Sequence, residues 1–102
     1  MNFDNTFGDE SLEIYVLSPS GAAVPKVLHD ELRRQVEEVI PTLRSGVNYR
    51  IQDFVTAAFW MPISRYVRRQ LGRCLADWVA RGEVDLEFVG CPMCNCKRYR
   101  PK

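Results

Sequence analysis

The chain reads SRYVRRQLGRCLADWVARGEVDLEFVG from residue 64 to residue 90, and this stretch determines the architecture. Ser64 can accept a hydrogen bond from a free amide of the first helical turn, and Gly82 can end the last turn. We therefore predict a helix from Ser64 to about Ala80. The apolar residues in and beside it recur at helical spacing and form one stripe: Ile63, Val67, Leu71, Cys74, Leu75, Trp78 and Val79.

A strand is predicted directly after this helix, because residues 83–89 alternate between apolar and polar side chains. Val84, Leu86 and Phe88 share the inward face of this strand. A loop over residues 90–96 then leads to a returning strand over residues 97–100, so the chain ends in a two-stranded hairpin.

Two further helices are predicted before residue 64. Pro25 suits the first turn of a helix, and apolar residues recur at helical spacing from Val24 to Leu43. Residues 47–49 can form a short edge strand, and residues 51–59 a brief helix that ends at Met61 and Pro62. The side chains expected to point inward from the brief helix are Ile51, Phe54, Val55 and Ala58.

This order of elements is typical of a winged helix, an α+β fold with three helices and a C-terminal two-stranded hairpin. An extra strand is predicted over residues 12–17; it can extend the sheet or pair across a dimer. Residues 1–11 are polar and acidic, and we expect a flexible arm there. The domain organisation is therefore an arm (1–11) followed by one winged-helix-like domain (12–102).

The composition indicates one globular domain, since the chain has 102 residues, of which 46% are hydrophobic and 26% charged. Its two longest uncharged runs, residues 14–25 and 54–64, are twelve and eleven residues long and both contain proline, whereas a membrane-spanning helix needs about 20 apolar residues. The N-terminus lacks the basic start and apolar core of a secretory signal. We therefore expect no membrane segment and a cytoplasmic location.

The charge is distributed unevenly along the chain. Residues 1–40 carry eight acidic and three basic side chains, a net charge of −5, and residues 41–102 carry eleven basic and five acidic ones, a net charge of +6. Such asymmetry favours either a polyanionic partner or association between opposite ends of two copies.

A basic ridge is predicted on the helix over residues 64–80. Arg65, Arg69 and Arg73 recur every fourth residue and Arg68 lies beside them, opposite the apolar stripe. Phosphates would convert the repulsion between these cations into attraction. Gly72 lies on the same side, where a missing side chain permits close approach, although glycine costs about 1 kcal/mol relative to alanine inside a helix.

The returning strand supplies further cations, since Lys97, Arg98 and Arg100 are interleaved with Tyr99. We predict that it forms a wing against duplex DNA, while the N-terminal part of the basic helix faces the major groove. If Asp85 and Glu87 pair with arginines across the hairpin, this wing is nearly neutral. A solvated helix face without a partner is the alternative interpretation of the ridge.

A resemblance covers roughly residues 47–100. The stretch YRIQDF (49–54), Trp60 and the run RQLGR (69–73) are similar to a family of small prokaryotic single-domain proteins of unknown function. The resemblance implies a winged-helix-like fold and no particular activity. The acidic arm and the cysteine cluster of residues 91–96 depart from that pattern.

Three cysteines lie close together in the loop over residues 90–96, namely Cys91, Cys94 and Cys96. A Cys-x-x-Cys loop can present two thiolates to one zinc ion, so these residues are candidate metal ligands. Cys96 can be a third ligand and Cys74 or His29 a fourth, although Cys74 falls within the apolar stripe, where a free cysteine packs as a small hydrophobe. Three interpretations stay open: a structural zinc, reduced loop thiols, and a redox or disulfide pair.

Enzyme signatures are not evident in the sequence. His29 is expected on the surface, with no nucleophile near it in sequence, and no glycine-rich phosphate loop is found. We therefore predict a non-enzymatic DNA-binding protein, a transcriptional regulator or accessory factor, that dimerises if it binds a specific sequence. The alternative is an adaptor that binds proteins or itself, with residues 1–40 as the contact region.

Overall fold

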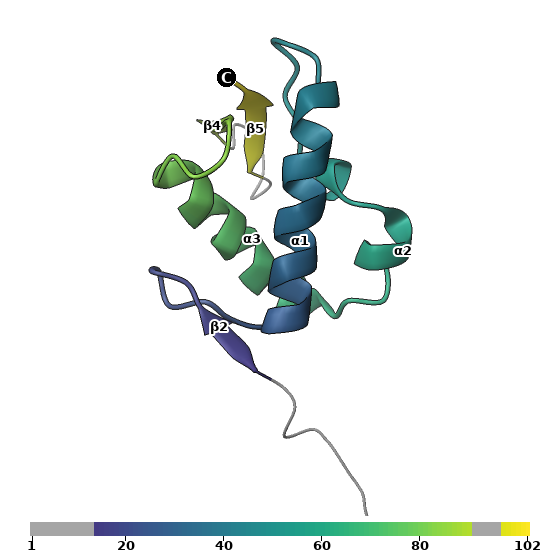
Figure 1. The fold of residues 1–102 in the computed structure, drawn as a ribbon, viewed down its shortest axis with the longest axis vertical. Helices are drawn as coiled ribbons and strands as arrows, with labels where there is room; N and C mark the ends of the chain where they lie inside the picture. Colours follow the sequence, from purple (N-terminus) through teal and green to yellow (C-terminus); the bar gives the residue numbers. More distant parts are fainter. Residues whose placement is uncertain (1–13, 91–96) are drawn as a thin grey trace, which may run out of the picture.

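The computed structural model describes residues 14–90 and 97–102 and shows a mixed α+β chain (Figure 1). Its elements, in chain order, are β2 (Tyr15–Leu17), β3 (Ala23–Pro25), α1 (Lys26–Val39), a 3-10 turn (Ile40–Thr42), a second 3-10 turn (Ile51–Phe54), α2 (Ala57–Trp60), α3 (Arg65–Ala80), β4 (Leu86–Gly90) and β5 (Arg98–Pro101). The strands form two separate antiparallel hairpins, β2–β3 and β4–β5. Residues 1–11, expected to form a flexible arm, lie outside the described residues.

The core lies where α1, α3 and the β4–β5 hairpin meet. Figure 1 shows α1 beside α3, with β4–β5 near one end of this pair and β2 near the other. The side chains that are shielded completely or almost completely come from β3, α1, α3 and the β4–β5 hairpin: Val24, Leu32, Val36, Leu71, Leu75, Leu86 and Tyr99. Burial of such apolar side chains is the main stabilising contribution to a domain of this size.

Helix α3 confirms the predictions made for it. The Ser64 hydroxyl accepts a hydrogen bond from the Val67 amide at 3.3 Å, and Gly82 adopts a φ of +73° immediately beyond the helix. The predicted apolar stripe is the inward face, since Leu71, Cys74, Leu75 and Trp78 are buried. One long face of α3 is therefore left for solvent or a ligand.

The N-terminal strand belongs to a hairpin of its own. β2 pairs with β3 through Val16 and Val24, and residues 18–21 form the turn between them. The sequence left open whether this strand joins the main sheet, and in the described residues it pairs with β3 only. The three-residue strand β3 was not predicted, because the helical apolar pattern already includes Val24.

The predicted helix over residues 51–59 is wrong, because two short elements take its place. The Asp53 carboxylate accepts from the Arg50 amide at 2.8 Å and closes a 3-10 turn, after which Val55 is extended with a φ of −128°. The Thr56 hydroxyl then accepts from the Phe59 amide at 3.2 Å and starts α2. Ala58 is exposed rather than inward.

The C-terminal hairpin differs from its prediction at one position. Val84 and Leu86 are buried as expected, but Phe88 is 52% exposed. The register of β4 against β5 shifts between Phe88 and Gly90, and the Phe88 ring lies against the edge of the Tyr99 ring, with centroids 5.8 Å apart. Tyr99 therefore occupies the core position and Phe88 covers it from outside.

The predicted edge strand of residues 47–49 is reduced to one bridge. The Tyr49 amide donates to the Tyr99 carbonyl oxygen at 2.6 Å, and the Tyr99 amide donates back to the Tyr49 carbonyl oxygen at 2.8 Å. This pair of hydrogen bonds ties β5 to the segment between α1 and α2.

Acid should weaken the fold through Glu31 on α1. Hydrogen bonds from Arg34 and Gln35 lower the pKa of Glu31 from 4.5 to about 2. Because the folded pKa lies below the unfolded one, this carboxylate stabilises the fold above pH 4.5, and its contribution is lost as the pH falls toward 2. We expect Glu31→Gln to show a smaller fall in melting temperature over this interval than the wild type, measured by circular dichroism. If the melting temperatures of the wild type and the variant fall equally with pH, the stabilising role of the Glu31 carboxylate is contradicted.

Candidate nucleic-acid interface

Arg65 and Arg69 project from the exposed face of α3. Both residues are exposed, and neither side chain has an ion-pair or hydrogen-bond partner among the residues that the structure describes. Their spacing of four residues places them on the same side of the helix. The predicted exposure of these two guanidinium groups is therefore confirmed, and their binding to an anion stays a prediction.

Arg68 does not join this ridge, contrary to the prediction that four guanidinium groups project together. Its Nη2 atom donates to the carbonyl oxygens of Trp60 and Met61 at 3.1 and 3.0 Å. The guanidinium carbon also lies 5.4 Å from the centre of the Trp60 ring. Arg68 therefore holds the end of α2 against the start of α3, and this contact is structural.

Arg68→Ala should destabilise the protein more than Arg69→Ala. The first change leaves the Trp60 and Met61 carbonyl oxygens without their charged donor, a loss of about 1–3 kcal/mol. The second removes an exposed side chain without a described partner and should alter stability by no more than about 0.5 kcal/mol. Urea unfolding of the two variants checks this; equal stabilities would show that the Arg68 contact contributes nothing.

Arg73 is shared between α3 and the turn of the N-terminal hairpin. Its Nη2 atom donates to the Ser20 carbonyl oxygen at 2.7 Å, and the Ser20 hydroxyl donates to the Asp77 carboxylate at 2.7 Å. A guanidinium group has five N–H donors, so this bond leaves most of the donors of Arg73 for another ligand.

A basic hollow of about 180 Å³ lies between α3 and the start of β5. Three cations line it, Arg69 and Arg73 from α3 and Lys97 from beside β5. Its other walls are Ile51, Gly72 and Tyr99. No acidic residue is among the described residues that line it, so the hollow is positively charged.

The predicted wing divides into two faces. Lys97 and Tyr99 line the basic hollow, and alternation along the strand directs Arg98 and Arg100 to the other face. Arg100 pairs with Glu87 across the hairpin, so the neutralisation considered in the sequence analysis occurs at this position. Nη1 of Arg98 is buried without a hydrogen-bond partner among the described residues. Lys97 is thus the wing cation that faces α3.

The proposed zinc ligands Cys91, Cys94 and Cys96 lie outside the described residues. Within residues 14–90 and 97–102, no three His, Cys, Asp or Glu side chains are grouped closely enough to hold a metal ion. Cys74 is 1% exposed, and burial together with the nearby Asp77 charge raises the pKa of its thiol to about 11. Cys74 is therefore a protonated core residue at neutral pH.

His29 lies less on the surface than predicted. Its side chain is only 20% exposed, because its ring packs edge-on against Trp78 with the ring centres 5.2 Å apart. Its Nδ1 atom also lies 2.9 Å from the Asp30 carboxylate. The sequence missed this contact because it joins α1 to α3 over a long distance in the chain.

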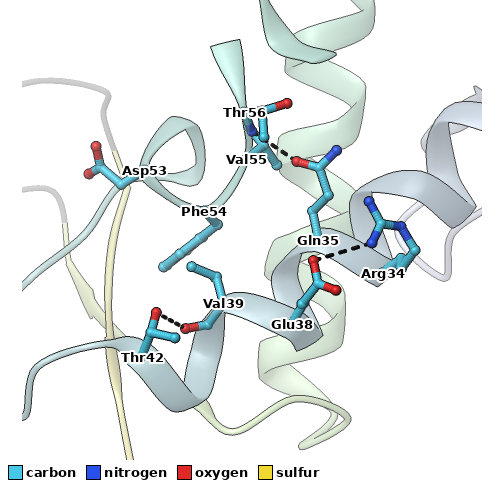
Figure 2. A pocket seen from close by; sticks show the side chains of 9 residues that line it. All are labelled: Arg34, Gln35, Glu38, Val39, Thr42, Asp53, Phe54, Val55 and Thr56. Carbon is cyan, nitrogen blue, oxygen red and sulfur yellow. Dashed lines mark hydrogen bonds and ion pairs between the residues drawn. The ribbon is translucent and has the colours of Figure 1, made fainter. Parts of the chain in front are cut away.

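Another hollow, of about 290 Å³, lies between the second half of α1 and residues 53–56 (Figure 2). Polar groups that line it are hydrogen-bonded to one another: the Thr56 amide donates to the Gln35 side chain at 2.8 Å, and Arg34 donates to Glu38 at 3.2 Å. Both signs of charge are present. These hydrogen bonds hold α1 against residues 53–56 and leave fewer polar groups for a ligand. The basic hollow is therefore the better candidate site.

Comparisons with protein-family models, curated proteins and solved structures found no match for this chain. The resemblance carried by residues 49–54, Trp60 and residues 69–73 therefore stays a prediction. Over the described part of the chain, the helices are too short or too polar to span a bilayer.

Proposed function

We propose that this chain is a small winged-helix DNA-binding protein, a transcriptional regulator or accessory factor, that docks α3 on duplex DNA. One observation carries the proposal: Arg65 and Arg69 project without described partners, and Arg69 converges with Arg73 and Lys97 on one hollow whose described lining includes no acidic residue. Converging cations are the footprint of a polyanion site; among them, Arg73 also interacts with the Asp77 carboxylate one turn away.

The arrangement of elements supports the winged-helix assignment. Helix α3 follows α2 after a short turn, as the second helix of a helix-turn-helix does when it enters the major groove. The bridge between Tyr49 and Tyr99 gives the hairpin a third, very short strand beside β5. In this arrangement the start of β5 flanks α3 and presents Lys97 to the phosphate backbone.

Salt dependence tests the proposal. Arg65 and the three cations of the hollow neutralise between two and four phosphates, the lower number if Arg69, Arg73 and Lys97 share one phosphate. This gives a slope of log affinity against log salt of roughly −2 to −4 for duplex DNA. We expect this slope in fluorescence anisotropy titrations of a random-sequence duplex between low and near-physiological salt. No binding at low salt, or binding that salt does not weaken, would overturn the proposal.

A second candidate is an adaptor that binds proteins or a second copy of itself. It is favoured by four exposed apolar side chains beside and on β2 and on the first turn of α1, namely Ile14, Tyr15, Leu17 and Val27, which are 55–78% exposed. Such a patch on a small domain favours a protein contact. Sedimentation of Leu17→Asp distinguishes the candidates: loss of an oligomer with unchanged duplex affinity assigns the patch to self-association and α3 to DNA.

A further inference from the structure

Gly72 lies in the interior of α3, where glycine costs about 1 kcal/mol relative to alanine. Its backbone is helical, so no positive φ requires glycine there. A Cβ added at this position would meet no atom within 4 Å, so packing does not require glycine either. The space that a side chain would enter is the basic hollow, which Gly72 lines.

The cations around Gly72 converge from two elements. Arg69 and Arg73 flank it on α3, and Lys97 closes the hollow from beside β5. Guanidinium groups match the oxygens of a phosphate with paired N–H donors, and lysine adds a point charge. We propose that the basic hollow is a seat for one phosphate group, which Gly72 leaves open for close approach.

The surroundings of the seat favour a phosphodiester over a free phosphate ion. An adjoining hollow of about 240 Å³ shares Lys97 and Tyr99 with the seat and is otherwise lined by Ala76, Val79, Ala80 and Phe88. A phosphate in a nucleic-acid backbone carries sugar carbons on both sides, and this apolar surface can cover them. The seat is thus where one strand of the duplex crosses between α3 and β5, an inference that rests on the proposed function.

Substitution of Gly72 separates binding from folding. Gly72→Ala should raise the melting temperature, because alanine favours the helix, and Gly72→Gln should remain folded and fill the hollow. Both should weaken duplex binding, the glutamine variant by roughly tenfold or more, equivalent to the loss of a hydrogen bond to a charged group. Arg69→Ala, which removes one wall of the seat, is the positive control.

A second experiment tests whether the hollow binds a free phosphate compound or a backbone phosphate of DNA. Inorganic pyrophosphate is titrated into the full chain, and the amide resonances of Gly72 and Lys97 are followed by NMR. Saturable shifts in the wild type that are lost in Gly72→Gln, together with weaker duplex binding by that variant, support a seat for a backbone phosphate.

The two experiments also distinguish failure of the phosphate seat from failure of the proposed DNA binding. Duplex binding that is equal in the wild type and both Gly72 variants overturns the seat and leaves DNA binding intact. Pyrophosphate shifts without any duplex binding support the seat, with a free phosphate compound as its ligand, and overturn the DNA proposal. If neither the duplex nor pyrophosphate binds, both the phosphate seat and the DNA-binding proposal are overturned.

Discussion

Reversing the charges of Arg65 and Arg69 together is expected to abolish measurable duplex binding while the protein stays folded. Each reversal removes a charge-assisted contact of about 1.5–3 kcal/mol, so the pair should lower affinity by roughly a hundred- to ten-thousandfold. Neither side chain has a partner in the described residues, so the fold should lose little stability. Anisotropy titrations measure the affinity, and circular dichroism checks the fold.

The matched control for this experiment is Arg44→Glu, compared with Arg69→Glu alone. Both variants change the net charge by the same amount, and Arg44 is exposed on the loop after α1 and does not line the basic hollow. A much larger loss for Arg69→Glu is expected, because phosphates are bound at one face. Equal losses of duplex affinity in the two single variants would show that the effect comes from net charge alone. Unchanged affinity in the folded Arg65/Arg69 double variant would refute α3 as the DNA-binding face.

Trp78→Ala should produce the largest loss of stability, about 3–5 kcal/mol. The Trp78 side chain is 6% exposed and lies at the contact of α1 with α3. His29 packs edge-on against its ring, and the Arg33 guanidinium carbon lies 4.9 Å from the ring centre. The expected loss is a large part of the 5–15 kcal/mol that typically holds a small domain together.

Urea unfolding of Trp78→Ala and Trp78→Phe measures this effect. Phenylalanine keeps an aromatic ring at the contact, so its variant should lose clearly less stability than the alanine variant. A loss below about 1 kcal/mol for Trp78→Ala would show that α1 and α3 do not depend on this ring.

The two long helices and the C-terminal hairpin are predictable from the sequence, because their causes are local. Apolar spacing sets the inward face of α3, the Ser64 hydroxyl caps it, and Gly82 ends it. The pairing of Glu87 with Arg100 also follows from local register, since the two residues are opposite each other across the hairpin.

Contacts between distant segments are what the sequence does not reveal. Arg68 lies next to the ridge residues in the sequence pattern, and only the position of the Trp60 and Met61 carbonyl oxygens explains why its side chain turns toward the protein instead. The same holds for Arg73, whose partner Ser20 is 53 residues away in the chain. Alternation does place Lys97 and Arg98 on opposite faces, but only the fold shows that the face of Lys97 is turned toward α3.

The Arg73 side chain belongs to two surfaces at once. One of its nitrogens holds the turn between β2 and β3 through Ser20, and the same side chain lines the basic hollow. A ligand in the hollow that draws Arg73 away from Ser20 loosens the hairpin that carries Tyr15 and Leu17. By thermodynamic reciprocity, a partner bound to that hairpin then changes the affinity of the hollow by the same factor. One guanidinium group thereby links the turn of the N-terminal hairpin to the basic hollow.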